Sequence, residues 1–154
     1  MVPTNKAVLL VDEVVLKQHA AKFKKYTVIA VASGEASKQL PYVLGIYEKL
    51  ISLGVDRSFT LIGVGGGVVT DIAGFVASTF LRGIAVGFVP TTILAMVDAC
   101  LGGKNGVDVG LAKNMVGVIR QPNFILYDVL WLKTLPQKEW SNGFAEIIKH
   151  ACIG

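Results

Sequence analysis

The stretch GVGGGVVTDIAGF, residues 63–75, places three consecutive glycines between an apolar run and a segment with helical spacing. A strand, a glycine turn and a helix N-terminus together form an anion site, because main-chain N–H groups and the helix dipole favour negative charge. Glycine also lets a pyrophosphate touch the main chain. The sequence therefore favours phosphate binding at Gly65, Gly66 and Gly67. The alternative is a tight strand-to-helix turn without a ligand.

The glycine turn matches neither of the two standard phosphate motifs. The Walker pattern ends in Gly-Lys-Ser/Thr, whereas residues 68–70 are Val-Val-Thr. The common dinucleotide pattern needs a glycine at position 68. An acid ends an earlier apolar run at Asp12. We therefore predict a nucleotide site of another design, with ribose held at Asp12, Glu35 and Lys38 and pyrophosphate at the glycines.

Several polar residues next to glycines or strand ends are further candidates. Thr91 and Thr92 follow a predicted strand, where α/β sheets bind ligands, or they cap the next helix. Asp71 contacts a ligand or complements the helix dipole. A clamp for a phosphorylated substrate is predicted from four residues, each of which alone is typical of a solvated surface: Arg82, Lys104, Lys113 and Asn114.

Glu146 and His150 lie one helical turn apart, as two metal ligands can. The alternative is an ordinary surface pair on a helix. A catalytic zinc ion needs three protein ligands, and the other histidine, His19, falls in a predicted surface helix. If zinc binds, we expect at least one ligand to be missing from this sequence.

The elements that must position these residues alternate along the chain. Apolar runs predict strands at 6–12, 27–34, 58–67 and 85–92, and helical spacing predicts helices at 13–26, 35–54, 68–81 and 136–154. We expect a kink near Pro41. The region after residue 100 is rich in Gly, Lys and Asn and is predicted to be a structured loop with short β-like pieces. This order predicts an α/β fold with a mostly parallel sheet and flanking helices.

Composition excludes several classes. The chain is 53% hydrophobic and 17% charged, and its net charge is +4. Its basic residues are scattered, which argues against nucleic acid. The longest uncharged run is shorter than the roughly 20 apolar residues of a membrane span, so no membrane partner is expected. Cys100 and Cys152 lie in apolar stretches, which favours buried free thiols and a cytoplasmic location.

Taken together, the segments GGGVVTDIAGFVASTFLRG, VPTTILAMVDACLGGKNGV, KNMVG, TLP and GFAEIIKH resemble the 3-dehydroquinate synthases of the sugar-phosphate cyclase family. The resemblance implies a carbon–oxygen lyase that uses NAD and Zn²⁺ or Co²⁺ to convert 3-deoxy-D-arabino-heptulosonate 7-phosphate into 3-dehydroquinate and phosphate in aromatic amino acid biosynthesis. It also implies a homodimer. The expected NAD-binding domain spans 1–137, and 138–154 is the first helix of a truncated helical C-terminal domain.

The resemblance also implies roles for individual residues. Asp98, Lys104, Asn114, Lys149 and Arg82 match substrate-binding or phosphate-binding positions, and Glu146 matches a metal ligand. Positions at the cofactor are matched by Asp12, Glu35, Lys38, Gly65, Gly66, Gly67, Asp71, Thr91, Thr92, Lys104, Lys113 and Thr134. No ligand role is implied for His150. Because the metal site would be incomplete, this chain alone is expected to turn over no substrate.

Departures from the family pattern leave alternatives open. Thr70, Asn105 and Asp108 stand where Gly, Thr and Asn are usual. One alternative is a sister cyclase of the valiolone or inosose synthase type. Another is a polyol dehydrogenase, which Val68 and Gly74 disfavour because they replace a Ser and a Lys of that pattern. A third is an NAD-binding module without catalysis.

Overall fold

The centre of the molecule is a parallel β-sheet whose five strands lie in the order β2-β1-β3-β4-β7. The computed structural model describes residues 2–153. The strands are β1 (Ala7–Asp12), β2 (Thr27–Val31), β3 (Thr60–Gly65), β4 (Ala85–Pro90) and β7 (Phe124–Ile125). β1, β3 and β4 are almost continuous apolar runs because both of their faces are covered. The predicted α/β class is confirmed.

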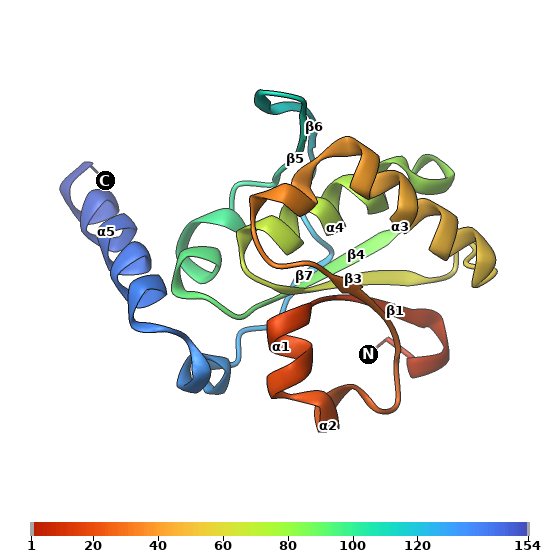
Figure 1. The fold of residues 1–154 in the computed structure, drawn as a ribbon, viewed down its shortest axis with the longest axis horizontal. Coiled ribbons are helices and arrows are strands. Elements are labelled where there is room, and N and C mark those ends of the chain that lie inside the picture. The colour runs from red at the N-terminus through yellow and green to blue at the C-terminus, as the bar shows by residue number, and fades with distance from the viewer. Residues whose placement is uncertain (1, 154) are drawn as a thin grey trace.

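Helices cover both faces of this sheet (Figure 1). α3 (Leu40–Ser52) and α4 (Gly67–Thr79) lie over one face, and α1 (Glu13–Gln18) and α2 (Ala20–Phe23) lie over the other. The larger core cluster, which includes Leu10, Leu50 and Phe88, fills the α3/α4 side. The smaller cluster, with Phe23 and Trp131, fills the opposite side. Because β1, β3 and β4 are parallel, their carboxyl ends lie at the same edge.

Two predicted helices differ from the observed ones. The segment predicted as one helix at 13–26 is divided at His19, whose φ of −127° and ψ of 30° interrupt the helical backbone. The segment predicted at 35–54 starts with a 3₁₀ turn, Glu35–Lys38, before α3 begins. Pro41 lies in the first turn of α3, where its missing N–H is not needed, so the expected kink is wrong.

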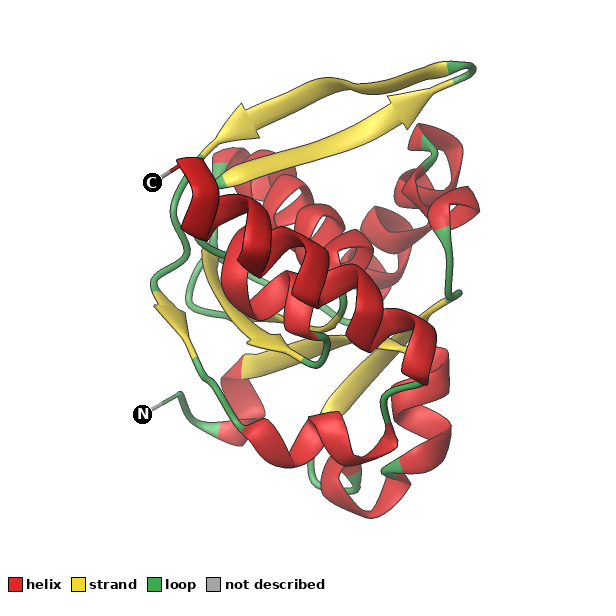
Figure 2. Ribbon diagram, turned by 90° about the vertical axis from the view of Figure 1, so that its left-hand side faces the viewer, coloured by secondary structure: helices red, strands yellow, loops and turns green. Residues whose placement is uncertain are grey.

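The region after residue 100 contains a second sheet that the sequence indicated only as short β-like pieces. β5 (Lys104–Val109) and β6 (Ala112–Ile119) form an antiparallel hairpin that stands apart from the parallel sheet (Figure 2). β5 packs against α4 and is buried at residues 105–108, whereas β6 is largely exposed. A hairpin with one solvent-facing strand needs no continuous apolar run. For this reason, the composition of residues 104–119 did not predict two paired strands.

The last helix, α5 (Gln137–Ile153), crosses the carboxyl edge of the parallel sheet (Figure 2). It approaches the segment after β4 at Gly143, where a Cβ would collide with Ile93. The domain boundary predicted at 137/138 therefore falls at the start of this helix and stays a prediction. The remaining short elements are the 3₁₀ turns Thr4–Lys6, Phe80–Arg82 and Val129–Thr134 and the π-helical turn Ala95–Ala99.

Both cysteines are free, but only one is buried. Burial raises the pKa of Cys100 to about 12, which keeps this thiol protonated. Cys152 is exposed on α5, so its expected burial is wrong. Within residues 2–153, no helix combines the length and the apolarity that crossing a membrane requires.

Candidate functional site

The glycine turn joins the end of β3 to the start of α4. Gly66 is the N-cap residue of α4, and the carbonyl of Gly65 accepts a hydrogen bond of 2.9 Å from the N–H of Thr91. In the described backbone, none of the three glycines has a positive φ. Space is therefore the reason for glycine here. A Cβ on Gly65 would lie 2.8 Å from the Cβ of Val69, so the packing of α4 on β3 requires this residue.

Gly66 and Gly67 serve a different purpose, because both line a cavity. We call it the glycine-turn cavity. Its volume is about 480 Å³, within the range of small-molecule sites. It lies at the carboxyl ends of β1, β3 and β4, where open α/β sheets bind ligands. The predicted cofactor residues on its wall are Asp12, Glu35, Gly66, Gly67, Thr91, Thr92 and Thr134.

Asp12 is held at the end of β1 by three hydrogen bonds to its Oδ1. The donors are the N–H groups of Val14, at 2.8 Å, and Val15, at 3.3 Å, and the hydroxyl of Ser33, at 2.8 Å. Asp12 is thus the N-cap of α1 as well as part of the cavity wall. Its carboxylate is oriented before any ligand arrives.

His19 is a residue of this cavity that the sequence did not single out. Its Nε2 lies 3.0 Å from the hydroxyl of Thr134, and its ring stands edge-on to Trp131 at 4.9 Å between centroids. Lys22 lies over the ring of Trp131, with its Nζ 4.1 Å from the ring centroid. His19 faces the glycine-turn cavity because the helical backbone is interrupted between α1 and α2. The spacing of apolar residues in this segment did not predict that interruption.

A second cavity lies between α4 and the β5–β6 hairpin, and we call it the hairpin cavity. Its volume is also about 480 Å³. It brings together four predicted residues, Asp71, Asp98, Lys104 and Asn114. The two cavities are neighbours, because a Cβ on Gly67 would lie 3.3 Å from the Cβ of Ala99, which lines the hairpin cavity.

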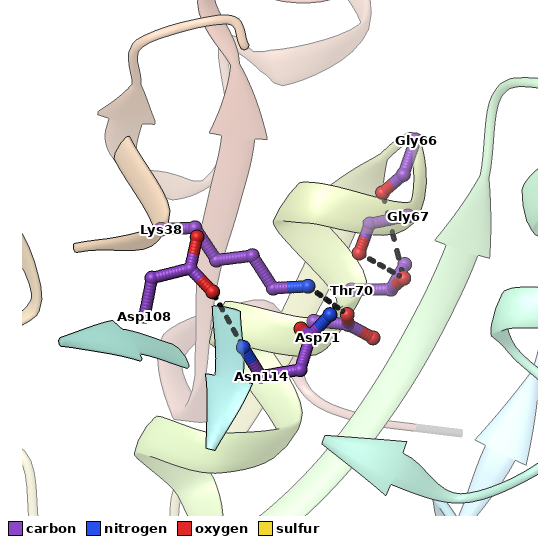
Figure 3. Close-up of polar contacts among 7 residues, drawn as sticks. All are labelled: Lys38, Gly66, Gly67, Thr70, Asp71, Asp108 and Asn114. Atoms are coloured by element: carbon purple, nitrogen blue, oxygen red, sulfur yellow. Dashed lines mark hydrogen bonds and ion pairs between the residues drawn. The ribbon is translucent and has the colours of Figure 1, made fainter. Parts of the chain in front are cut away.

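Asp71, on the wall of the hairpin cavity, forms a largely buried ion pair with Lys38 (Figure 3). The Nζ of Lys38 donates to Oδ2 of Asp71 at 2.6 Å, and the side chains are 6% and 18% exposed. Burial raises the pKa of Asp71 above its usual value of 3.8, and the hydrogen bond from Lys38 offsets part of this effect. Lys38 is therefore engaged inside the protein and does not line the glycine-turn cavity.

Asn114 is placed in the hairpin cavity by a buried carboxylate. Oδ1 of Asp108 accepts a hydrogen bond of 2.7 Å from the backbone N–H of Asn114 (Figure 3). Asn114 has a φ of 54°, a left-handed conformation that Asn tolerates better than most residues. Asp108 and Asn105, two departures from the family pattern, are both buried in β5. Asp108 shapes the hairpin and is not on the cavity wall, whereas Asn105 does line the hairpin cavity. The side-chain amide of Asn105 donates hydrogen bonds to the carbonyls of Gly103 and Arg120.

A carboxylate–histidine cluster lies where α5 meets the π-helical turn. The donor atoms of Asp98, Glu146 and His150 are all within 4.8 Å of one another. Glu146 Oε1 is 3.5 Å from His150 Nε2, and Asp98 Oδ1 is 3.7 Å from the same nitrogen. Lys149 also contacts Oε1 of Glu146. Carboxylate oxygens and an imidazole nitrogen are a donor set that suits zinc and cobalt.

The structure does not bring every predicted residue to the two cavities. Arg82 follows α4 in a strained turn with a φ of 64°, and it lies on neither cavity wall. Lys113 is exposed on β6, and Lys149 is half-exposed beside Glu146. Their substrate and cofactor roles stay predictions.

Comparison with known proteins identifies the family. The family model described as 3-dehydroquinate synthase N-terminal matches residues 28–142. A 3-dehydroquinate synthase of Pyrococcus abyssi is 50% identical over 125 residues, which are 81% of this chain and 37% of that protein. A pentafunctional AROM polypeptide of Zygosaccharomyces rouxii is 51% identical over 124 residues, 80% of this chain and 8% of that protein.

The fold matches a solved structure of 2-deoxy-scyllo-inosose synthase complexed with carbaglucose-6-phosphate, NAD⁺ and Co²⁺. The TM-score is 0.83 at 31% identity, over 96% of this chain and 44% of that one. The chain thus spans less than half the length of these relatives. With the family model matched over most of its length, the chain belongs to the 3-dehydroquinate synthase family, of which it represents the N-terminal portion.

Proposed function

We propose that this chain supplies the NAD-binding part, and part of the substrate site, of a 3-dehydroquinate synthase. The enzyme would convert 3-deoxy-D-arabino-heptulosonate 7-phosphate into 3-dehydroquinate and phosphate, a carbon–oxygen lyase reaction of aromatic amino acid biosynthesis. One observation carries the proposal. The glycine-turn cavity and the hairpin cavity adjoin at Gly67 and Ala99, so a dinucleotide in one would lie next to a polar substrate in the other.

The glycine-turn cavity suits NAD in its chemistry. The N-terminus of α4 offers main-chain N–H groups and a positive dipole end to a diphosphate at Gly66 and Gly67. Asp12, fixed by three donors, is an acceptor for ribose hydroxyls. When bound, NAD supplies a reversible hydride acceptor, and Zn²⁺ or Co²⁺ near Glu146 supplies a Lewis acid.

The hairpin cavity suits a phosphorylated sugar acid. Lys104 brings a flexible cation, and Asn114 brings an amide that both donates and accepts hydrogen bonds. Asp98 offers a carboxylate that accepts hydrogen bonds from sugar hydroxyls. These residues orient the substrate and hold its anionic groups. The homodimer and the cytoplasmic location are part of the proposal through the family resemblance.

Calorimetry on the purified chain tests the substrate part of this proposal. With NAD⁺ at saturation, we expect 3-deoxy-D-arabino-heptulosonate 7-phosphate to bind, and Lys104→Met to weaken it at least about tenfold through the loss of charge-assisted hydrogen bonds. Lys17→Met, which removes an exposed lysine of α1, is the matched control and should bind like the original chain. Equal affinity of the Lys104 variant and the original chain would contradict the proposal.

A sister cyclase is the second candidate, because the matched inosose synthase structure shares this fold with carbaglucose-6-phosphate bound. The same calorimetric experiment separates the two functions. A 3-dehydroquinate synthase should prefer the heptulosonate phosphate to carbaglucose-6-phosphate. The opposite preference would favour the sister cyclase.

A further inference from the structure

One end of the glycine-turn cavity lies along α1 and is largely apolar. Its wall follows this helix from Asp12 through Val15 to His19. It continues at Leu135 and Pro136. An apolar wall with a small number of polar groups suits a flat aromatic base.

The adenosine half of a dinucleotide fits this end of the cavity. The proposed reaction needs the nicotinamide next to the substrate, and the hairpin cavity adjoins at Gly67 and Ala99. With the diphosphate at Gly66 and Gly67, the other half of the cofactor extends away from that border. Asp12 receives its ribose, so the base follows the wall of α1 toward His19.

The imidazole of His19 is held in one orientation and one tautomer. The hydroxyl of Thr134 donates its single proton to the carbonyl of Trp131, at 3.3 Å, so it accepts from His19, whose Nε2 lies 3.0 Å away. Nε2 therefore carries the proton, which leaves Nδ1 of the neutral ring as an acceptor. The ring also stands edge-on to Trp131, at 4.9 Å between centroids.

Nδ1 of His19 is available to a ligand. Within residues 2–153, no protein group donates a hydrogen bond to this atom, and no buried side-chain nitrogen is left without a partner. Nδ1 is therefore accessible on a residue of the cavity wall. The 6-amino group of adenine is a donor that matches this acceptor, whereas the 6-oxygen of hypoxanthine is itself an acceptor.

We propose that Nδ1 of His19 accepts a hydrogen bond from the 6-amino group of the adenine base, so that His19 selects adenine dinucleotides over their deaminated form. The proposal deepens the proposed function and rests on it. It adds a cofactor-contacting residue for which neither the glycine turn nor the family resemblance implied a role.

Calorimetric comparison of NAD⁺ with nicotinamide hypoxanthine dinucleotide tests this contact, at about pH 8, where an ordinary imidazole is neutral. The original chain should prefer NAD⁺ at least about fivefold, because the oxygen cannot donate to Nδ1. His19→Phe keeps a ring beside Trp131 and removes both nitrogens, so its preference should fall below about twofold. His19→Asn, whose side-chain carbonyl replaces the Nδ1 acceptor, should retain part of the preference.

A matched control separates this contact from a general change in the protein. Tyr26→Phe removes one polar atom from an exposed ring that lies on neither cavity wall, so it should keep the preference of the original chain. NAD⁺ binding with no preference in the original chain, or with an equal preference in His19→Phe, would overturn this inference alone. A folded original chain that binds no NAD⁺ would contradict the proposed function as well.

Discussion

At the scale of single residues, Lys38 and Asp71 form an ion pair in the interior of the molecule. Their types and positions were visible in the sequence, and both were predicted to contact the cofactor. Their mutual ion pair was not predictable, because it joins a 3₁₀ turn to α4 across 33 positions. Asp12, predicted to hold the ribose, lies on the wall of the glycine-turn cavity, and the acid directly follows a buried strand. Its role at the cofactor stays a prediction.

Breaking this pair on one side should be costly. Lys38→Met should lower the free energy of unfolding by about 3 kcal/mol, because the buried carboxylate loses its partner. The double variant Lys38→Met with Asp71→Leu should recover most of that loss. The exposed pair Lys22–Asp128 is the control, and Lys22→Met should cost less than about 1 kcal/mol. Chemical denaturation measures all of these values. A double variant no more stable than Lys38→Met would contradict a coupled pair.

The raised pKa of Asp71 predicts a specific pH dependence. In the folded protein this carboxyl binds its proton more tightly than in the unfolded chain. Relative to Asp71→Asn, the original chain should therefore gain stability as the pH falls through the raised pKa, and the gain should level off below the usual value of 3.8. Denaturant melts of both proteins across this range measure the difference. A relative loss of stability on acidification would show that the pKa is lowered instead.

At the scale of elements, α4 decides the arrangement of the site, because glycines on it and on β3 permit very close packing. Gly63 and Gly65 face α4, and Gly74 faces the side chain of Asn105 on β5. The parallel strands were predicted because their residues are apolar on both faces. The β5–β6 hairpin was not predicted, because the exposed strand β6 has no continuous run of apolar residues. The hairpin cavity was therefore invisible in the sequence, although four of its residues were named.

The contact between Gly74 and Asn105 predicts a compensating pair of substitutions. Gly74→Ala should destabilise the chain by about 1–3 kcal/mol through overpacking, and this cost should shrink in the background of Asn105→Ala. Gly45→Ala is the matched control on α3, where nothing lies within 4 Å of an added Cβ. It should stabilise the chain by about 0.5–1 kcal/mol. Equal costs of Gly74→Ala in both backgrounds would contradict close α4–β5 packing.

At the scale of the whole molecule, the fold brings two cavities and a carboxylate–histidine cluster to the carboxyl edge of one sheet. Sequence reasoning predicted the sheet and its carboxyl edge, and it named seven of the residues that line the glycine-turn cavity. It missed His19, because the break between α1 and α2 carries no pattern. It also did not predict that Asp98 lies beside Glu146 and His150, because only the packing of α5 brings them together.

The central claim is that the N-terminus of α4 binds the diphosphate of a dinucleotide.

Calorimetric titration of the chain with NAD⁺ tests that claim most directly, using Gly66→Asp. Aspartate is a favourable N-cap, so this variant should fold, and its carboxylate would face the diphosphate. Gly45→Asp adds the same charge on α3 as a control. We predict that the original chain and Gly45→Asp each bind one NAD⁺, and that Gly66→Asp binds at least about tenfold more weakly. Unchanged NAD⁺ affinity in a folded Gly66→Asp variant would place the diphosphate elsewhere and contradict the account.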